Sequence, residues 1–157
     1  KNSPLWLNLN YDGDRKSKEI KYLIVTAERA IQGLDNSHMP HLHGHGNKIQ
    51  VEHVLPQDAK QLDARWFDGD KPTEAHDTQK YHFGNHCLLP DSLNSQAKNK
   101  SPTEKLKHLK DKNSATRFAT TKRVIDIISS SGDWGEKEMG EYSKFLMGKI
   151  IDFYGTK

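Results

Sequence analysis

The 157-residue sequence contains a single cysteine, Cys87. A disulfide within the chain and a cysteine-rich zinc ribbon are therefore excluded, and a reducing, intracellular setting is the simpler interpretation. No run approaches the roughly 20 consecutive apolar residues that a membrane-spanning helix needs. The first residues lack the apolar core of a signal peptide, and the first methionine is Met39, so we expect a fragment of a longer protein.

Hydrophobic residues make up only 33% of the chain and charged residues 29%, which predicts one domain over residues 1–157 with a modest core. The net charge is only +3, but its distribution is uneven. Between Leu93 and Arg123, nine Lys/Arg residues are accompanied by only two acids, Glu104 and Asp111. Such a run is either a solvated face or a surface that meets phosphates, and the charges alone leave both open.

Hydrophobic periodicity and turn residues predict an α+β domain. In chain order, the pattern predicts a helix at 17–32, a strand at 48–55, a polar loop at 58–80, a strand at 81–90, and helices at 91–99, 101–110, 114–130 and from 133 onward. Ser101 and Glu104 form a capping box, and Asp133 with Glu136 is a second candidate cap. Trp66, Phe67 and Trp134 are expected to be packing anchors. The strand, loop, strand and short helix define a core at 48–100, with a helical flank at 101–157.

The first strand ends in a glutamate and a histidine, within the segment KIQVEHVLPQ at 48–57. Successive strand residues point to opposite faces, but Pro56 forces a turn, so Glu52 and His53 can approach one site from different angles. A carboxylate suits a hard cation such as Mg²⁺ or Mn²⁺, and a neutral imidazole suits proton abstraction from water. The pair predicts metal-assisted hydrolysis.

The second strand and the helix after it supply further polar groups. Asn85 opens the strand and Asn94 opens the helix, where its amide oxygen is an acceptable ligand for a hard metal. Lys98 lies one helical turn beyond Asn94 and would hold a phosphate beside the metal. Asparagine is also favoured in turns and at helix caps, so both residues could serve local structure as well.

Together the segments VEHVLPQ, GNHCLLPDSLN and NK resemble the HNH, or ββα-metal (His-Me finger), endonucleases. The closest similarity is to the C-terminal nuclease domain of GmrSD-type modification-dependent restriction enzymes, a group that includes SspE-like phosphorothioate-sensing defence proteins. The similar core spans residues 49–105. The third position of the H-N-H signature is Asn94 here rather than histidine.

The resemblance implies a role for each matching residue. His53 would be the general base, Glu52 and Asn94 the ligands of one Mg²⁺ or Mn²⁺ ion, and Asn85 the residue that pins the loop and orients His53. Lys98, Asn99, Lys100 and Lys105 lie where DNA phosphate or structural contacts are expected. The implied protein is a bacterial, cytoplasmic, DNA-nicking enzyme of anti-phage restriction, whose N-terminal NTP-using sensor domain is missing from this chain.

Two histidine features stay open. His86 stands where the family usually has an apolar residue. If its side chain points into the site it could be a further metal ligand or acid, but we expect it to point away as a surface side chain. His41, His43 and His45 alternate in HLHGHG and would share one face of a strand, where they could bind Zn²⁺ or Ni²⁺, although the glycines favour a flexible loop. Two alternative functions stay open. One is a DNA-binding module that has lost catalysis, and the other is a His-rich metal-binding scaffold.

Overall fold

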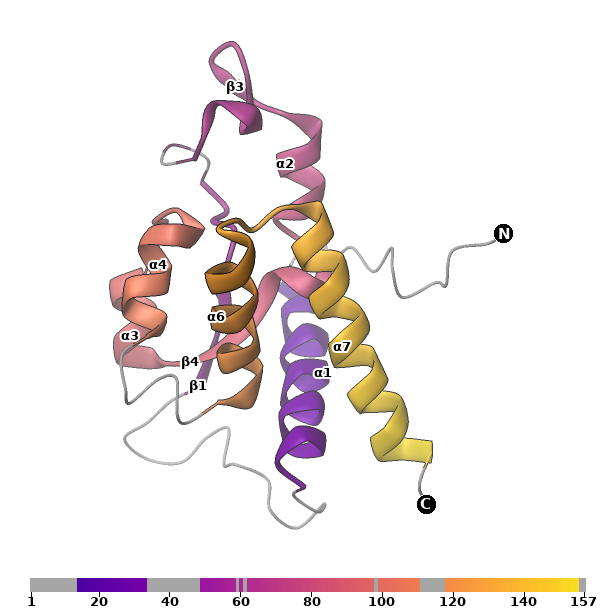
Figure 1. The fold of residues 1–157 in the computed structure, drawn as a ribbon. Coiled ribbons are helices and arrows are strands. Elements are labelled where there is room, and N and C mark those ends of the chain that lie inside the picture. Colours follow the sequence, from indigo (N-terminus) through magenta and orange to yellow (C-terminus); the bar gives the residue numbers. More distant parts are fainter. Residues whose placement is uncertain are drawn as a thin grey trace.

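The computed structural model of the chain describes residues 14–33, 49–58, 60, 62–97, 99–110 and 118–155. Its helices are α1 (Asp14–Gln32), α2 (Glu74–Gln79), α3 (Asp91–Ala97), α4 (Pro102–Leu109), α6 (Ala119–Ser131) and α7 (Glu136–Gly155), with 3₁₀ turns η3 (Ala64–Trp66) and η4 (Phe83–Asn85). Its strands are β1 (Ile49–His53), β2 (Phe67–Asp68), β3 (Lys71–Pro72) and β4 (His86–Pro90). The fold is α+β, as the sequence predicts (Figure 1).

A two-stranded antiparallel sheet followed directly by a short helix forms the centre of the domain. β1 pairs with β4 in a register that places Glu52 opposite Cys87 and His53 opposite His86. Helix α3 begins at the residue after β4 and packs against both strands. This arrangement is the predicted ββα core. Both strands are shorter than predicted, since the backbone turns after His53 and η4 replaces the beginning of the second strand.

Helices surround this small sheet and supply most of the core. α1 and α7 lie side by side, α1 and α6 contact β4, and α4 packs on α6 (Figure 1). The apolar stripe predicted for α1 is buried, with Ile24 fully inaccessible, and it meets Leu88, Val124 and Tyr142 in one hydrophobic cluster. None of the described helices is long and apolar enough to cross a membrane.

Helix ends account for several polar contacts. The capping box of Ser101 and Glu104 at the start of α4 is confirmed. The cap predicted at Asp133 and Glu136 is wrong by two residues, because α7 begins later and Glu138 accepts a hydrogen bond from the backbone N–H of Gly135. Asp133 instead forms a two-pronged ion pair with Arg65, which ties η3 to the segment before α7.

The segment predicted as a long loop at 58–80 contains regular structure, so that prediction is wrong. It folds into η3, the β2–β3 hairpin and α2, which Thr73 caps by accepting a hydrogen bond from the N–H of His76. Gly69 has a φ of 63°, which closes the hairpin turn. Trp66 is buried, as predicted, and His76 is fully buried with Nε2 3.0 Å from the carbonyl oxygen of Pro56. The polar composition of this segment predicted a loop, but its helical turn and helix pack on the domain through the buried side chains of Trp66 and His76.

Gly84 in η4 packs closely against the backbone of α7. A Cβ atom at this position would lie 2.1 Å from the carbonyl oxygen of Met139. We expect Gly84→Ala to lower the free energy of unfolding by about 2–3 kcal/mol, because backbone atoms of α7 must move. Urea unfolding would measure this loss. Gly140→Ala is the matched control, since nothing lies within 4 Å of its Cβ, and a similar loss in both variants would contradict the packing argument.

Candidate active site

A cleft with a volume of about 290 Å³ opens at the end of β1. Its walls come from β1, the turn after it, α3 and the segment leading into α4, so residues far apart in the sequence share one space. The lining residues are Val51, Glu52, His53, Pro56, Gln57, Asn94, Ser95, Asn99 and Lys105. The cleft therefore brings together Glu52, His53 and Asn94, the predicted ligands and base, with two of the predicted DNA-contacting residues.

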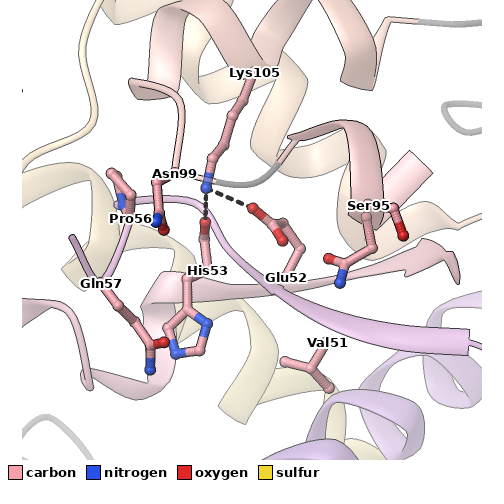
Figure 2. A pocket seen from close by; sticks show the side chains of 9 residues that line it. Val51, Glu52, His53, Pro56, Gln57, Ser95, Asn99 and Lys105 are labelled. Carbon is pink, nitrogen blue, oxygen red and sulfur yellow. Dashed lines mark hydrogen bonds and ion pairs between the residues drawn. The ribbon is translucent and has the colours of Figure 1, made fainter. Parts of the chain in front are cut away.

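Glu52 and Lys105 form a buried ion pair at one side of this cleft. Nζ of Lys105 lies 2.5 Å from Oε1 of Glu52 and also donates to the carbonyl oxygen of His53 (Figure 2). Glu52 is 6% exposed and Lys105 is fully inaccessible. Burial raises the pKa of the Glu52 carboxyl and lowers the pKa of the Lys105 ammonium, while the attraction between the two groups opposes both shifts. The pair fixes the carboxylate at the edge of the cleft.

The imidazole of His53 lies on the other side of its own backbone from Lys105, toward Gln57 (Figure 2). Burial, together with the positive charge of Lys105, lowers the pKa of His53 from 6.5 to about 4. The ring is therefore neutral near pH 7, which is the form that can accept a proton. Its edge-to-face contact with His86, at 4.5 Å between ring centroids, limits how it can rotate.

Asn85 lies behind the cleft and holds the turn that follows His53. Its Oδ1 accepts hydrogen bonds from the N–H of Leu55 at 2.7 Å and from the indole N–H of Trp134 at 3.1 Å. Its Nδ2 donates to the carbonyl oxygens of Leu55 at 2.9 Å and Lys80 at 3.0 Å. The Asn85 carbonyl also accepts from the N–H of Val54. The side chain is fully buried and hydrogen-bonded, so its geometry suits a positioning role.

Asn94 provides the test of whether the cleft suits a divalent metal. Its Oδ1 is buried and has no hydrogen-bond partner among the described residues, although a buried amide oxygen normally has one. A cation at the cleft would satisfy this oxygen together with the carboxylate of Glu52. Two protein oxygens fit Mg²⁺ or Mn²⁺, which keep several water ligands and bind substrate phosphates. Within the described ranges, no three His, Cys, Asp or Glu side chains gather as a metal site.

The other predicted DNA-contacting residues have different surroundings. Asn99 is exposed at the mouth of the cleft. Lys100 does not line the cleft, and its Nζ lies 2.5 Å from Nε2 of His108. Lys98 lies outside the described residues, as do the three histidines of HLHGHG at 41–46. The structure thus places Asn99 and Lys105 in the cleft and Lys100 beside it.

His86 is not the surface residue that the sequence suggested. It is 1% exposed, and its Nδ1 lies 3.3 Å from the carbonyl oxygen of Phe83. The antiparallel register places His86 directly opposite His53. Its ring therefore packs against the imidazole of His53 instead of reaching solvent. Burial, followed by the proximity of His53, lowers the pKa of His86 to about 3.

This lowered pKa predicts that the fold loses stability in acid. The unfolded chain binds a proton at His86 below about pH 6.5, whereas the folded chain does not until about pH 3, so stability is complete above the first value and falls below it. Between pH 7 and pH 5 the expected loss from this group is about 2 kcal/mol. Urea unfolding at both pH values checks it. His86→Phe should show a smaller loss, and an equal loss in both proteins would contradict the assignment.

Sequence reasoning missed several lining residues. Gln57 ends the quoted segment VEHVLPQ, and that position was the available signal, although no role was assigned to it. Ser95 follows Asn94 on the same turn of α3 and is exposed. Neither the burial of Lys105 nor the anchoring of Pro56 by His76 had a local signal, because both depend on contacts between distant segments.

Comparison with known proteins identifies the family. The family model described as the C-terminal domain of GmrSD restriction endonucleases matches residues 4–149. The chain belongs to this family. Searches of curated proteins and of solved structures gave no significant match. The predicted closeness to GmrSD-type enzymes is confirmed, and the match includes every residue assigned to the cleft.

Membership of the GmrSD C-terminal domain family sets the general function. The chain is a nuclease domain of the restriction endonuclease type, which acts on DNA. Nucleases of this kind generally use divalent metal ions, and the oxygens of Glu52 and Asn94 are suitable ligands.

Proposed function

We propose that this domain is an HNH-type endonuclease that hydrolyses DNA phosphodiester bonds with one Mg²⁺ or Mn²⁺ ion and nicks one strand at a time. The observation that carries the proposal is the buried Oδ1 of Asn94, which has no hydrogen-bond partner within the described residues and lies in the same cleft as the carboxylate of Glu52 and the neutral imidazole of His53. Two hard oxygen donors beside a base meet the needs of metal-assisted hydrolysis.

In the proposed reaction, His53 accepts the proton of the attacking water. Asn85 keeps the turn at Val54 and Leu55 in place, so the His53 ring stays aimed into the cleft. The negative charge of bound DNA raises the pKa of His53 back toward neutrality, where a general base is most effective. Glu52 and Asn94 would hold the ion, which supplies charge stabilisation at the phosphate and the leaving oxygen.

Lysines around the cleft would hold the DNA. Asn99 at the mouth and Lys100 beside it would contact the DNA backbone, and Lys98 belongs to the same segment of the sequence. Lys105, whose ammonium is buried against Glu52 and the carbonyl oxygen of His53, would act on the DNA through its charge rather than by direct contact. One catalytic centre of this kind cuts one strand per event, so double-strand breaks require two events or two copies.

The biological setting follows from the family and belongs to the proposal. The family match makes the domain a restriction endonuclease domain. We propose that it is the effector of bacterial anti-phage restriction in the cytoplasm. An N-terminal, NTP-using sensor of modified DNA would direct it in the complete protein.

A supercoiled-plasmid assay tests the proposal. With Mg²⁺ or Mn²⁺ we expect open circles to accumulate before linear DNA, and a chelator to stop the reaction. Asn94→Ala should reduce the rate by about 10- to 100-fold through loss of a metal ligand. Ser95→Ala, a neighbour that lines the same cleft, is the matched control and should change the rate less than about threefold. Chelator-resistant cutting, or equal rates for both variants, would refute the assigned metal site.

A further inference from the structure

Lys105 is an unusual residue to find inside a metal-dependent cleft. It extends from α4 to the end of β1, 53 residues earlier in the chain, and is fully inaccessible to solvent. Its ammonium binds the carboxylate of Glu52 and the carbonyl oxygen of His53 (Figure 2). Among the described residues that line the cleft, Glu52 alone has a carboxylate. A positive side chain therefore already occupies one oxygen of the group that would bind the metal.

The charge of the cleft follows from its lining residues. Glu52 and Lys105 together carry no net charge, and His53 adds no negative charge whether its ring is neutral or protonated. The remaining lining residues, Val51, Pro56, Gln57, Asn94, Ser95 and Asn99, carry no ionisable group. A divalent ion that entered this cleft alone would meet no net negative charge and would be repelled by the ammonium of Lys105. A DNA phosphate would supply the missing negative charge.

We propose that Lys105 is a positioning residue that neutralises Glu52, so that the divalent ion and the DNA phosphate bind the cleft cooperatively. The inference rests on the proposed nuclease function. It adds that the divalent ion and the DNA each bind more tightly when the other is present. Before DNA binds, Lys105 keeps a buried carboxylate paired and aimed, which avoids the large cost of an uncompensated charge. When DNA binds, the negative charge of the phosphate attracts the ion and offsets the repulsion from Lys105. By linkage, the ion strengthens DNA binding by the same factor.

The first test measures Mn²⁺ binding with and without DNA. The 157-residue chain carrying His53→Ala keeps Glu52, Asn94 and Lys105 but lacks the base, so a short DNA duplex stays intact. The electron paramagnetic resonance signal of free Mn²⁺ reports binding. We expect the duplex to strengthen Mn²⁺ binding by at least about tenfold after subtraction of Mn²⁺ bound by the duplex alone. Glu52→Gln in the same background should remove the increase. Equal Mn²⁺ affinity with and without duplex would overturn the proposal.

The second test removes the charge of Lys105. Lys105→Met should bind Mn²⁺ without DNA at least about tenfold more tightly than the unmodified chain, because the repulsion is gone. Its thermal midpoint should be lower without metal, and Mn²⁺ should raise that midpoint by at least about 2 °C more than in the unmodified chain. Lys105→Arg keeps the charge and should retain the DNA dependence. A lysine needed only for folding would leave Mn²⁺ affinity unchanged, which would overturn the proposal.

These outcomes separate this inference from the proposed function. The coupling measurement uses native Lys105, so it stands even if Lys105→Met does not fold. Plasmid nicking by the unmodified chain, together with Mn²⁺ binding that ignores DNA, would refute the cooperative assembly alone. No plasmid nicking in any divalent metal, with an intact fold, would refute the function on which the inference rests.

Discussion

His53→Ala is expected to reduce plasmid nicking by about 100- to 10,000-fold, the range typical for loss of a general base. The reason is that, among the described residues that line the cleft, His53 is the one titratable side chain outside the Glu52–Lys105 pair, and its lowered pKa keeps it neutral at neutral pH. Rates of open-circle formation in Mg²⁺ and Mn²⁺ measure the effect.

Two controls make the result specific to proton transfer. The variant should keep the DNA affinity of the unmodified chain within experimental error and remain folded at the assay temperature, because His53 is only half-buried and lies outside the hydrophobic cluster. Added imidazole should restore part of the activity by filling the space of the missing ring. A variant that nicks at an undiminished rate would mean that another group takes the proton.

The same variant separates the alternative functions. A catalytically silent DNA-binding module would bind DNA with strong salt dependence and show no metal-dependent nicking in the unmodified chain, so His53→Ala would change little. A His-rich metal scaffold would show no DNA binding. Family membership favours the nuclease over both.

Asn85→Ala is expected to lower the free energy of unfolding by about 4 kcal/mol or more, because it leaves several buried backbone and indole groups without partners. The lost hydrogen bonds reach Leu55 twice, Lys80 and Trp134. Since Leu55 follows β1, which carries the proposed base His53, nicking should also fall at temperatures where the variant remains folded. Urea unfolding and plasmid assays at low temperature measure the two effects.

Asn99→Ala is the matched control for this prediction. It removes the same side chain from an exposed position at the cleft, so the free energy of unfolding should change by less than about 0.5 kcal/mol. Asn85→Asp tests the donor role directly, since a carboxylate cannot donate to the carbonyls of Leu55 and Lys80. An Asn85→Ala variant as stable as Asn99→Ala would show that Asn85 does not hold the turn.

Several parts of the fold were predictable because they depend on interactions within a few residues. The apolar stripe of α1 and the capping box of α4 are set by neighbours three or four positions away, and both are confirmed. The short strands with Glu52 and His53 at the end of the first were recognisable from alternation and from Pro56. The segment at 58–80 was not, because its two-residue strands are too short to show a period.

The sequence by itself determined which chemical groups are present and their order along the chain: Glu52, His53, Asn85 and Asn94. Only the tertiary structure decided which of them share a cleft and what surrounds them. Lys105 belongs to a basic run that suggests a charged surface, yet pairing with Glu52 across 53 residues makes its burial favourable. His86 is likewise buried because the β1–β4 register sets it against His53. Ion pairs and packing contacts between residues this far apart in the sequence leave no pattern among neighbouring residues. Only the folded chain shows which residues form them.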